Sequence, residues 1–171
     1  MLRNALDAQL IAGQQRRDRT TDWYTDRKVP LGDKARADIA QAQQRAGRRG
    51  AAILRGKVIA ELSFGFWRFL LARQYKTKLW PDLAGAFRHA PDRALPMVED
   101  PVARLHKFRN RIAHHEGIWH LPTEARRDDI QTVLGFRGRF VTLWQALSSP
   151  DGVGEGRNPP VRSRSCAGVM M

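Results

Sequence analysis

Apolar residues recur at helical spacing along most of the chain. In residues 2–17 the leucines lie four positions apart, which predicts an amphipathic helix. A second helical stretch, 34–46, is opened by Asp33 and closed by Gly47. Because this stretch is rich in Ala, Gln and Arg and poor in large apolar residues, we expect it to lie on the surface.

Residues 51–73 carry the strongest apolar signal. From 58 to 71 apolar side chains surround nearly the whole helical circumference, which predicts a central buried helix. Gly65 lowers helix stability there, and we expect it to mark a close approach of another helix. Glu61 and Arg68 interrupt the apolar run seven residues apart, on one helical face. They form either a buried polar network that supports a catalytic helix or a narrow solvent-facing strip.

The remaining pattern is also helical. No convincing strand alternation, internal repeat or second domain is present. Further helical segments are predicted, separated by proline-containing breaks, over residues 80–89, 98–115, 123–134 and 140–147. The last residues, 148–171, are rich in Gly and Pro without apolar periodicity, which predicts a disordered tail. The pattern therefore predicts an all-α fold, with one helical domain over 1–147 and a disordered C-terminal tail.

The composition adds a strong positive charge to this picture. The 171 residues carry a formal net charge of +13, with 30 Lys and Arg against 17 Asp and Glu. The excess is distributed along the predicted domain, and most of the basic residues are arginine. Guanidinium groups bind phosphates through a planar fork and stack on bases, so this bias favours a nucleic-acid partner. Genomic base composition that favours Arg codons would give the same bias without a functional demand.

The single cysteine, Cys166, excludes an internal disulfide framework and a cysteine-based zinc site. The longest apolar block contains two charged residues and is shorter than the ~20 residues of a membrane span. The N-terminus has no signal-peptide pattern. We therefore expect a cytoplasmic protein that is not inserted in a membrane.

The candidate chemistry is concentrated in residues 102–120, which contain four of the five histidines. At ~100° per residue, Leu105 and Ile112 mark a buried stripe, and Arg109 falls inside it. An arginine that faces a core is costly unless its charge is paired or used. Glu116 could pair with it if the helix extends that far.

Three interpretations of this segment stay open. In the first, Arg109 and Glu116 form a partly buried ion pair and the histidines are surface residues. In the second, His106, His114 and His115 bind zinc, although no His-Glu-x-x-His arrangement exists. In the third, arginine and histidine act together on a phosphodiester, because histidine can transfer protons and arginine can stabilise charge on phosphorus.

The order of residues in this segment resembles a known motif. Arg109-Asn110-Arg111-Ile112-Ala113-His114 resembles the Arg-polar-x-x-x-His motif of the HEPN superfamily of ribonucleases. The extension through His115-Glu116 is similar to its Abi-like (abortive infection) branch. Other blocks resemble the same family in the same order, namely residues 2–6, 56–67 and 80–87. The likeness covers residues 2–134.

This resemblance implies an HEPN-like helical bundle that forms a homodimer. In the family, two copies of the motif meet at the interface and form a metal-independent endoribonuclease site. Here Arg109 would stabilise the transition state, His114 would act as general acid or base, and Asn110 would orient the phosphate or the histidine. The resemblance implies RNA as the substrate, no cofactor and no metal, and a role in phage abortive infection or as a toxin, with a possible antitoxin partner.

Other polar residues are candidates for support or RNA contact. His115 lies four residues after Arg111 and could contact RNA, or the two could form a solvated pair. The candidate supporting or RNA-binding residues are Arg111, His115, Glu116, Glu61, Arg68 and His106. The aromatic residues Phe66, Trp67, Phe69 and Trp80 are predicted to pack in the core, and we expect no exposed stacking platform for bases.

The chain departs from the family at both ends. It begins at the block that resembles the end of the family's first helix, and the likeness fades after Leu134. We therefore expect a shortened version of the family domain. A catalytically inactive RNA-binding or protein-interaction module of the same fold remains the alternative function.

Overall fold

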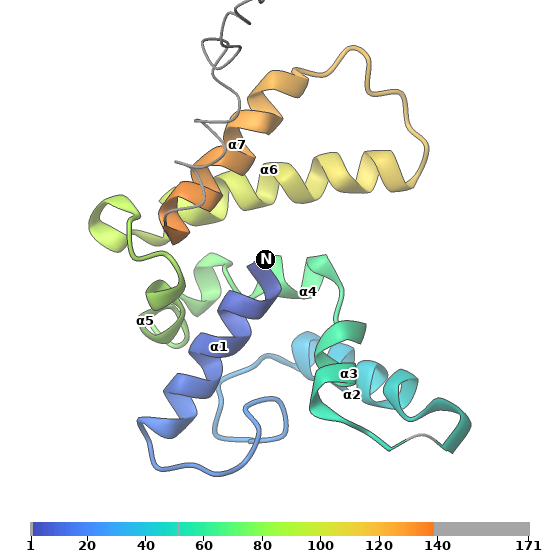
Figure 1. Cartoon of the computed structure of the whole chain (residues 1–171), viewed down its shortest axis with the longest axis vertical. Helices are drawn as coiled ribbons and strands as arrows, with labels where there is room; N and C mark the ends of the chain where they lie inside the picture. Colours follow the sequence, from blue (N-terminus) through green and yellow to red (C-terminus); the bar gives the residue numbers. More distant parts are fainter. Residues whose placement is uncertain (1, 51, 139–171) are drawn as a thin grey trace, which may run out of the picture.

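The computed structural model describes residues 2–50 and 52–138, and these residues form helices joined by turns, without a strand (Figure 1). This confirms the predicted all-α class. The α-helices are α1 (Leu2–Gln15), α2 (Asp33–Ala46), α3 (Arg55–Glu61), α4 (Phe64–Phe69), α5 (Trp80–Leu83), α6 (Leu95–Ala113) and α7 (Thr123–Arg137). Short 3₁₀ turns lie between them, namely η1 (Arg48–Gly50), η2 (Arg73–Tyr75), η3 (Ala84–Ala86) and η4 (Pro91–Arg93). The predicted helix 140–147 and the predicted tail 148–171 lie outside the described residues.

The prediction of one long helix over 51–73 is wrong. The chain leaves helical geometry at Leu62 (φ −70°, ψ 125°) and restarts at Ser63, whose Oγ accepts a hydrogen bond of 3.2 Å from the Phe66 N–H. If the segment were one straight helix with apolar residues on all sides, some of these residues would face away from the core and be exposed. The break lets α3 bury Val58 and α4 bury Trp67 in the same core, at 0% and 1% exposure.

The two N-terminal helical predictions are confirmed, but α2 is less superficial than expected. Three alanines and one isoleucine at helical spacing give α2 a buried face that packs on α3, namely Ala35, Ile39, Ala42 and Ala46. Gly47 ends α2, as its position in the sequence predicts. Because alanine side chains are small, α2 can approach α3 closely. A helix with few large apolar residues therefore still contributes to the core.

The connection between α1 and α2 is anchored in the core by Trp23, which is 1% exposed. Its indole Nε1–H donates a hydrogen bond of 2.8 Å to Asp7 Oδ1 on α1, and Arg55 at the start of α3 pairs with the same carboxylate. Such a partner is what a buried indole N–H requires. These contacts therefore fix the polar connection to α1 and to the start of α3.

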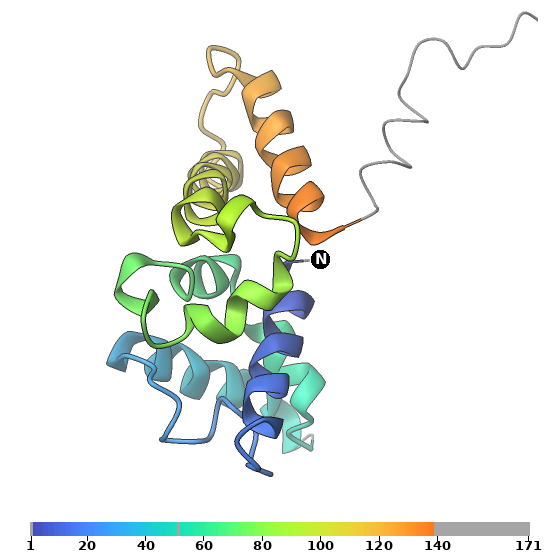
Figure 2. The ribbon, with the colours of Figure 1, turned by 90° about the vertical axis from the view of Figure 1, so that its left-hand side faces the viewer.

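Helices α6 and α7 form a hairpin on one side of the body built by α1 to α5 (Figures 1 and 2). The N-terminal half of α6 rests on the body through Leu95, Val98 and Val102, which are at most 2% exposed. Val133 of α7 also reaches the core. No helix in the described ranges 2–50 and 52–138 is long and apolar enough to cross a membrane.

Candidate functional site

The candidate residues lie on the C-terminal half of α6, where the helix passes beyond the body. The core-facing stripe of its N-terminal half continues through Leu105, which is partly buried, to Arg109 and Ile112. Arg109 is exposed and Ile112 is 48% exposed. The helical periodicity therefore predicted the correct face of α6 for Arg109. The expectation that this face is buried is wrong, because the described part of the body does not extend under the last turns of α6.

The end of α6 is fixed by its own backbone. The His115 N–H donates to the Ile112 carbonyl at 3.1 Å, and the Glu116 N–H donates to the Arg111 carbonyl at 2.9 Å. These paired bonds form a Schellman motif, in which the residue after the C-cap is left-handed. That residue is His115, with φ 56°, so His114 is the C-cap at the last helical turn.

The predicted ion pair between Arg109 and Glu116 is wrong. Because the chain turns away after Ala113, Glu116 lies beside Arg111 instead, with 3.7 Å between Glu116 Oε2 and Arg111 Nε. The Arg109 Nη1–H donates a long hydrogen bond of 3.4 Å to Asn110 Oδ1. The Arg109 guanidinium has no carboxylate partner among the ion pairs of the described residues, so its charge is available to a ligand.

An apolar groove of about 560 Å³ lies beside Arg109. Side chains of α6, α7 and the first residue of α4 line it, including Phe64, Leu105, Phe108, Ile112 and Ile130. Ile112 and Ile130 are each 48% exposed. A charged guanidinium at an apolar surface loses less of its field to water than one on an open polar surface.

His106 connects the candidate residues to the body. Its Nε2 lies 3.4 Å from Asn110 Nδ2, one helical turn away, and its ring lies against Phe64 with 5.8 Å between ring centroids. A Cβ on Gly65 would lie 3.1 Å from His106 Nε2, so the close helix approach predicted at Gly65 is confirmed. Burial, reinforced by the charges of Arg68 and Arg109, lowers the pKa of His106 below its ordinary value.

Glu61 and Arg68 do not form the buried polar network considered for them. The break at Leu62 separates them into α3 and α4, and Glu61 is exposed at the end of α3, which fits the solvent-facing interpretation. Arg68 is half-buried, and its Nε has no hydrogen-bond partner among the described residues. Arg68 therefore acts on the candidate site through its charge near His106.

His114, His115 and Arg111 are exposed, so they are accessible to a large ligand. No hydrogen bond joins Arg109 to His114 in the part of the chain that the structure describes. In residues 2–50 and 52–138 no three His, Cys, Asp or Glu side chains gather in an arrangement that could hold a metal ion.

Sequence reasoning missed Trp119, which lies between α6 and α7 and is 88% exposed. The expectation of no exposed aromatic platform is therefore wrong. A Cβ at Gly117 would lie 2.5 Å from the Trp119 ring, so the ring packs closely over Gly117. A tryptophan in a segment without apolar periodicity gives no local signal of exposure.

Comparison with known proteins adds no relative, since no family model, curated protein or solved structure matches this chain.

Proposed function

We propose that the protein is a metal-independent endoribonuclease of the Abi-like HEPN type that acts as a homodimer in phage abortive infection or as a toxin. The observation that carries the proposal is the position of Arg109. It continues the core-facing stripe of α6, lies at an apolar groove, and is exposed among the residues that the structure describes. A second copy of α6 and α7 would cover the groove through a self-complementary two-fold contact.

A homodimer would also bring together Arg109 and His114, which do not meet within the described residues of one chain. Arg109 and His114 point in directions ~140° apart on the helix, and no hydrogen bond joins them within the described chain. Across a two-fold axis, Arg109 of one copy would face His114 of the other. Each of the two resulting sites would then combine side chains from both copies.

The proposed reaction is transesterification at an RNA phosphodiester. A base takes the proton of the 2′-hydroxyl, the 2′-oxygen bonds to phosphorus, and the bond from phosphorus to the 5′-oxygen breaks as that oxygen receives a proton. His114 would serve as the acid or base, and Arg109 would stabilise the additional negative charge on the phosphoryl oxygens. Asn110, held between Arg109 and His106, would orient the phosphate or the histidine.

The test is cleavage of single-stranded RNA in EDTA. Wild-type protein is expected to cut RNA but not an oligonucleotide with 2′-deoxyribose throughout. Arg109→Ala and His114→Ala should each lower the rate by about 100-fold or more, with the helical circular dichroism spectrum retained. Arg127→Ala and His120→Ala remove exposed residues of the same types outside the motif and should cleave as wild type.

Unchanged cleavage in both motif variants would contradict the assignment of the site. The absence of a contact between Arg109 and His114 within the described chain also favours the second candidate, a non-catalytic RNA-binding or protein-interaction module. Salt-sensitive RNA binding without any product would identify that module. Purification with an antitoxin-like protein that blocks cleavage would support the toxin role.

A further inference from the structure

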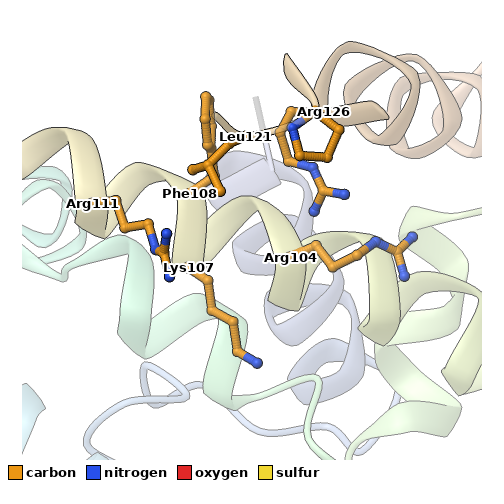
Figure 3. Close-up of a pocket in the computed structure, with 7 residues that line it drawn as sticks. Arg104, Lys107, Phe108, Arg111, Leu121 and Arg126 are labelled. Carbon is orange, nitrogen blue, oxygen red and sulfur yellow. The ribbon is translucent and has the colours of Figure 1, made fainter. Parts of the chain in front are cut away.

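A second, basic cavity of about 220 Å³ lies between α6 and the start of α7 (Figure 3). Four cationic residues line it, namely Arg104, Lys107, Arg111 and Arg126. Phe108 and Leu121 supply apolar lining. Figure 3 shows the first three cations leaving one helix, while Arg126 and Leu121 come from the other side of the cavity.

The basic stripe on α6 is regular. Arg104, Lys107, Phe108 and Arg111 follow the spacing i, i+3, i+4 and i+7, so they share one face of the helix. This face is distinct from the stripe that carries Arg109. In a helix that packs against a partner, such spacing normally carries apolar residues. Here it places three cations and one aromatic ring along a cavity.

Two of the guanidinium groups are held in place by Asp129. Arg104 donates to Asp129 through Nε at 3.1 Å to Oδ1 and 3.2 Å to Oδ2, and Arg126 Nη1 lies 3.2 Å from Asp129 Oδ2. Asp129 is 6% exposed. The hydrogen bonds to Asp129 raise the pKa of Arg104 above its ordinary value. Since one carboxylate serves two arginines, this group keeps a net positive charge.

The remaining cations are barely neutralised. Glu116 lies 3.7 Å from Arg111, and both side chains are exposed, so their attraction is weak. Lys107 is exposed and takes part in no ion pair among the residues that the structure describes. An anion at the mouth of the cavity would therefore meet guanidinium groups held by Asp129, while Lys107 extends away from Arg126 and adds its charge to the same helix face (Figure 3).

We infer that this cavity binds one nucleotide of a single-stranded RNA, with a phosphate on the cations and the base against Phe108 and Leu121. Cations beside an aromatic and aliphatic surface are the combination that single-stranded nucleic acids require. The cavity is smaller than the ~300–1,000 Å³ that encloses a free drug-sized ligand, which favours one unit of a longer chain.

This subsite deepens the proposed function and depends on RNA being its substrate. Arg109 and Arg111 lie on different faces of the same helix, whose diameter with side chains is ~10–12 Å. One RNA chain can therefore contact the cavity and the Arg109 surface together. The cavity would hold a nucleotide that flanks the cleaved bond, and it would determine affinity more than the rate of the chemical step.

The experiment measures fluorescence anisotropy of a labelled 12-nucleotide 2′-O-methyl RNA, which lacks the 2′-hydroxyl nucleophile and is not cut during the titration, over a series of salt concentrations. Lys107→Gln and Arg111→Gln should each weaken binding by about five-fold and reduce the slope of log affinity against log salt by about 0.7. Arg127→Gln is the matched control, because it removes one charge from α7 outside the cavity. Its affinity should remain within about two-fold of wild type. Inorganic polyphosphate should bind more weakly than RNA, since it offers no base to Phe108.

Three results would overturn the inference: wild-type affinity in both cavity variants, an equal loss in Arg127→Gln, or equal affinity for polyphosphate and RNA. Cleavage of the unmodified RNA of the same sequence, in EDTA, separates this inference from the proposed function. Cavity-dependent binding without any product would retain the subsite and contradict the ribonuclease. Cleavage with unchanged binding in the cavity variants would retain the ribonuclease and contradict the subsite.

Discussion

At the scale of single residues, the candidate site depends on groups whose charge is poorly compensated. Arg109 has no carboxylate partner in the described chain, and Lys107 has none either. Burial and the charges of two nearby arginines lower the pKa of His106. Asn110 lies between Arg109 and His106 and can transmit the position of one to the other. The positive charge of Arg109 and Lys107 on α6 is therefore not neutralised by a carboxylate of the described residues.

The lowered pKa of His106 predicts an acid-sensitive fold. In the unfolded chain this histidine takes up a proton near its ordinary pKa of about 6.5, whereas the folded chain resists protonation. The unfolded state therefore binds more protons as the pH falls below 6.5, and the stabilisation is lost as pH falls towards the lower pKa of the folded state.

The measurement is the melting temperature (Tm) of wild type and His106→Gln between about pH 7.5 and pH 5. The Tm of wild type should fall more steeply on acidification than that of His106→Gln. His120→Gln, at an exposed histidine, controls for the loss of any one imidazole. Parallel curves for wild type and His106→Gln would contradict the assignment.

At the scale of elements, α6 and α7 are the parts that determine the site, and Asp129 is the main polar link between them. It accepts hydrogen bonds from Arg104 on α6 and forms an ion pair with Arg126 on its own helix. Because Asp129 is buried, both arginines depend on it for compensation. The hairpin rests on the body through the N-terminal half of α6, the contact of His106 with Phe64 and a few residues of α7, so this link contributes to its rigidity.

Replacing Asp129 should therefore destabilise the protein. Asp129→Asn removes the charge that neutralises two guanidinium groups, and we expect a loss of about 1–3 kcal/mol in the free energy of unfolding. Asp128→Asn is the matched control at the neighbouring position, where the side chain is exposed and its ion pair of 3.8 Å is weak. It should change stability by less than about 0.5 kcal/mol. Urea denaturation of both variants checks this, and equal stabilities would show that the link is unimportant.

The elements also show what local sequence could and could not predict. The helices α1, α2 and α7 follow periodicity and end signals that lie within their own residues, so they were predictable. The break at Leu62 was missed because the cap residue, Ser63, lies inside a segment that is apolar on nearly all sides of a helix. The exposure of Arg109 was missed for a different reason. The helical periodicity predicts on which face of α6 a residue lies. It does not predict how far the body extends beneath that face, because this depends on the whole fold.

At the scale of the whole molecule, the described residues leave one apolar surface of α6 and α7 exposed. The core stripe of α6 continues into an exposed apolar groove that contains the arginine of the motif. The basic cavity lies on another face of the same helix. A two-fold dimer through the groove would cover its apolar side chains, join Arg109 to the partner's motif and leave the cations of the cavity open to RNA, with Phe108 at the boundary between the groove and the cavity. The central claim is therefore that catalysis requires two chains.

Purified heterodimers test this claim most directly. Arg109→Ala and His114→Ala chains carrying different affinity tags would be produced together and isolated by both tags. If each site takes its arginine from one chain and its histidine from the other, one of the two sites in such a heterodimer is intact. The heterodimer should then cleave RNA in EDTA at about half the wild-type rate, while each variant homodimer stays at least about 100-fold below wild type. A heterodimer as inactive as the two homodimers, or failure of the tagged chains to purify together, would contradict the account.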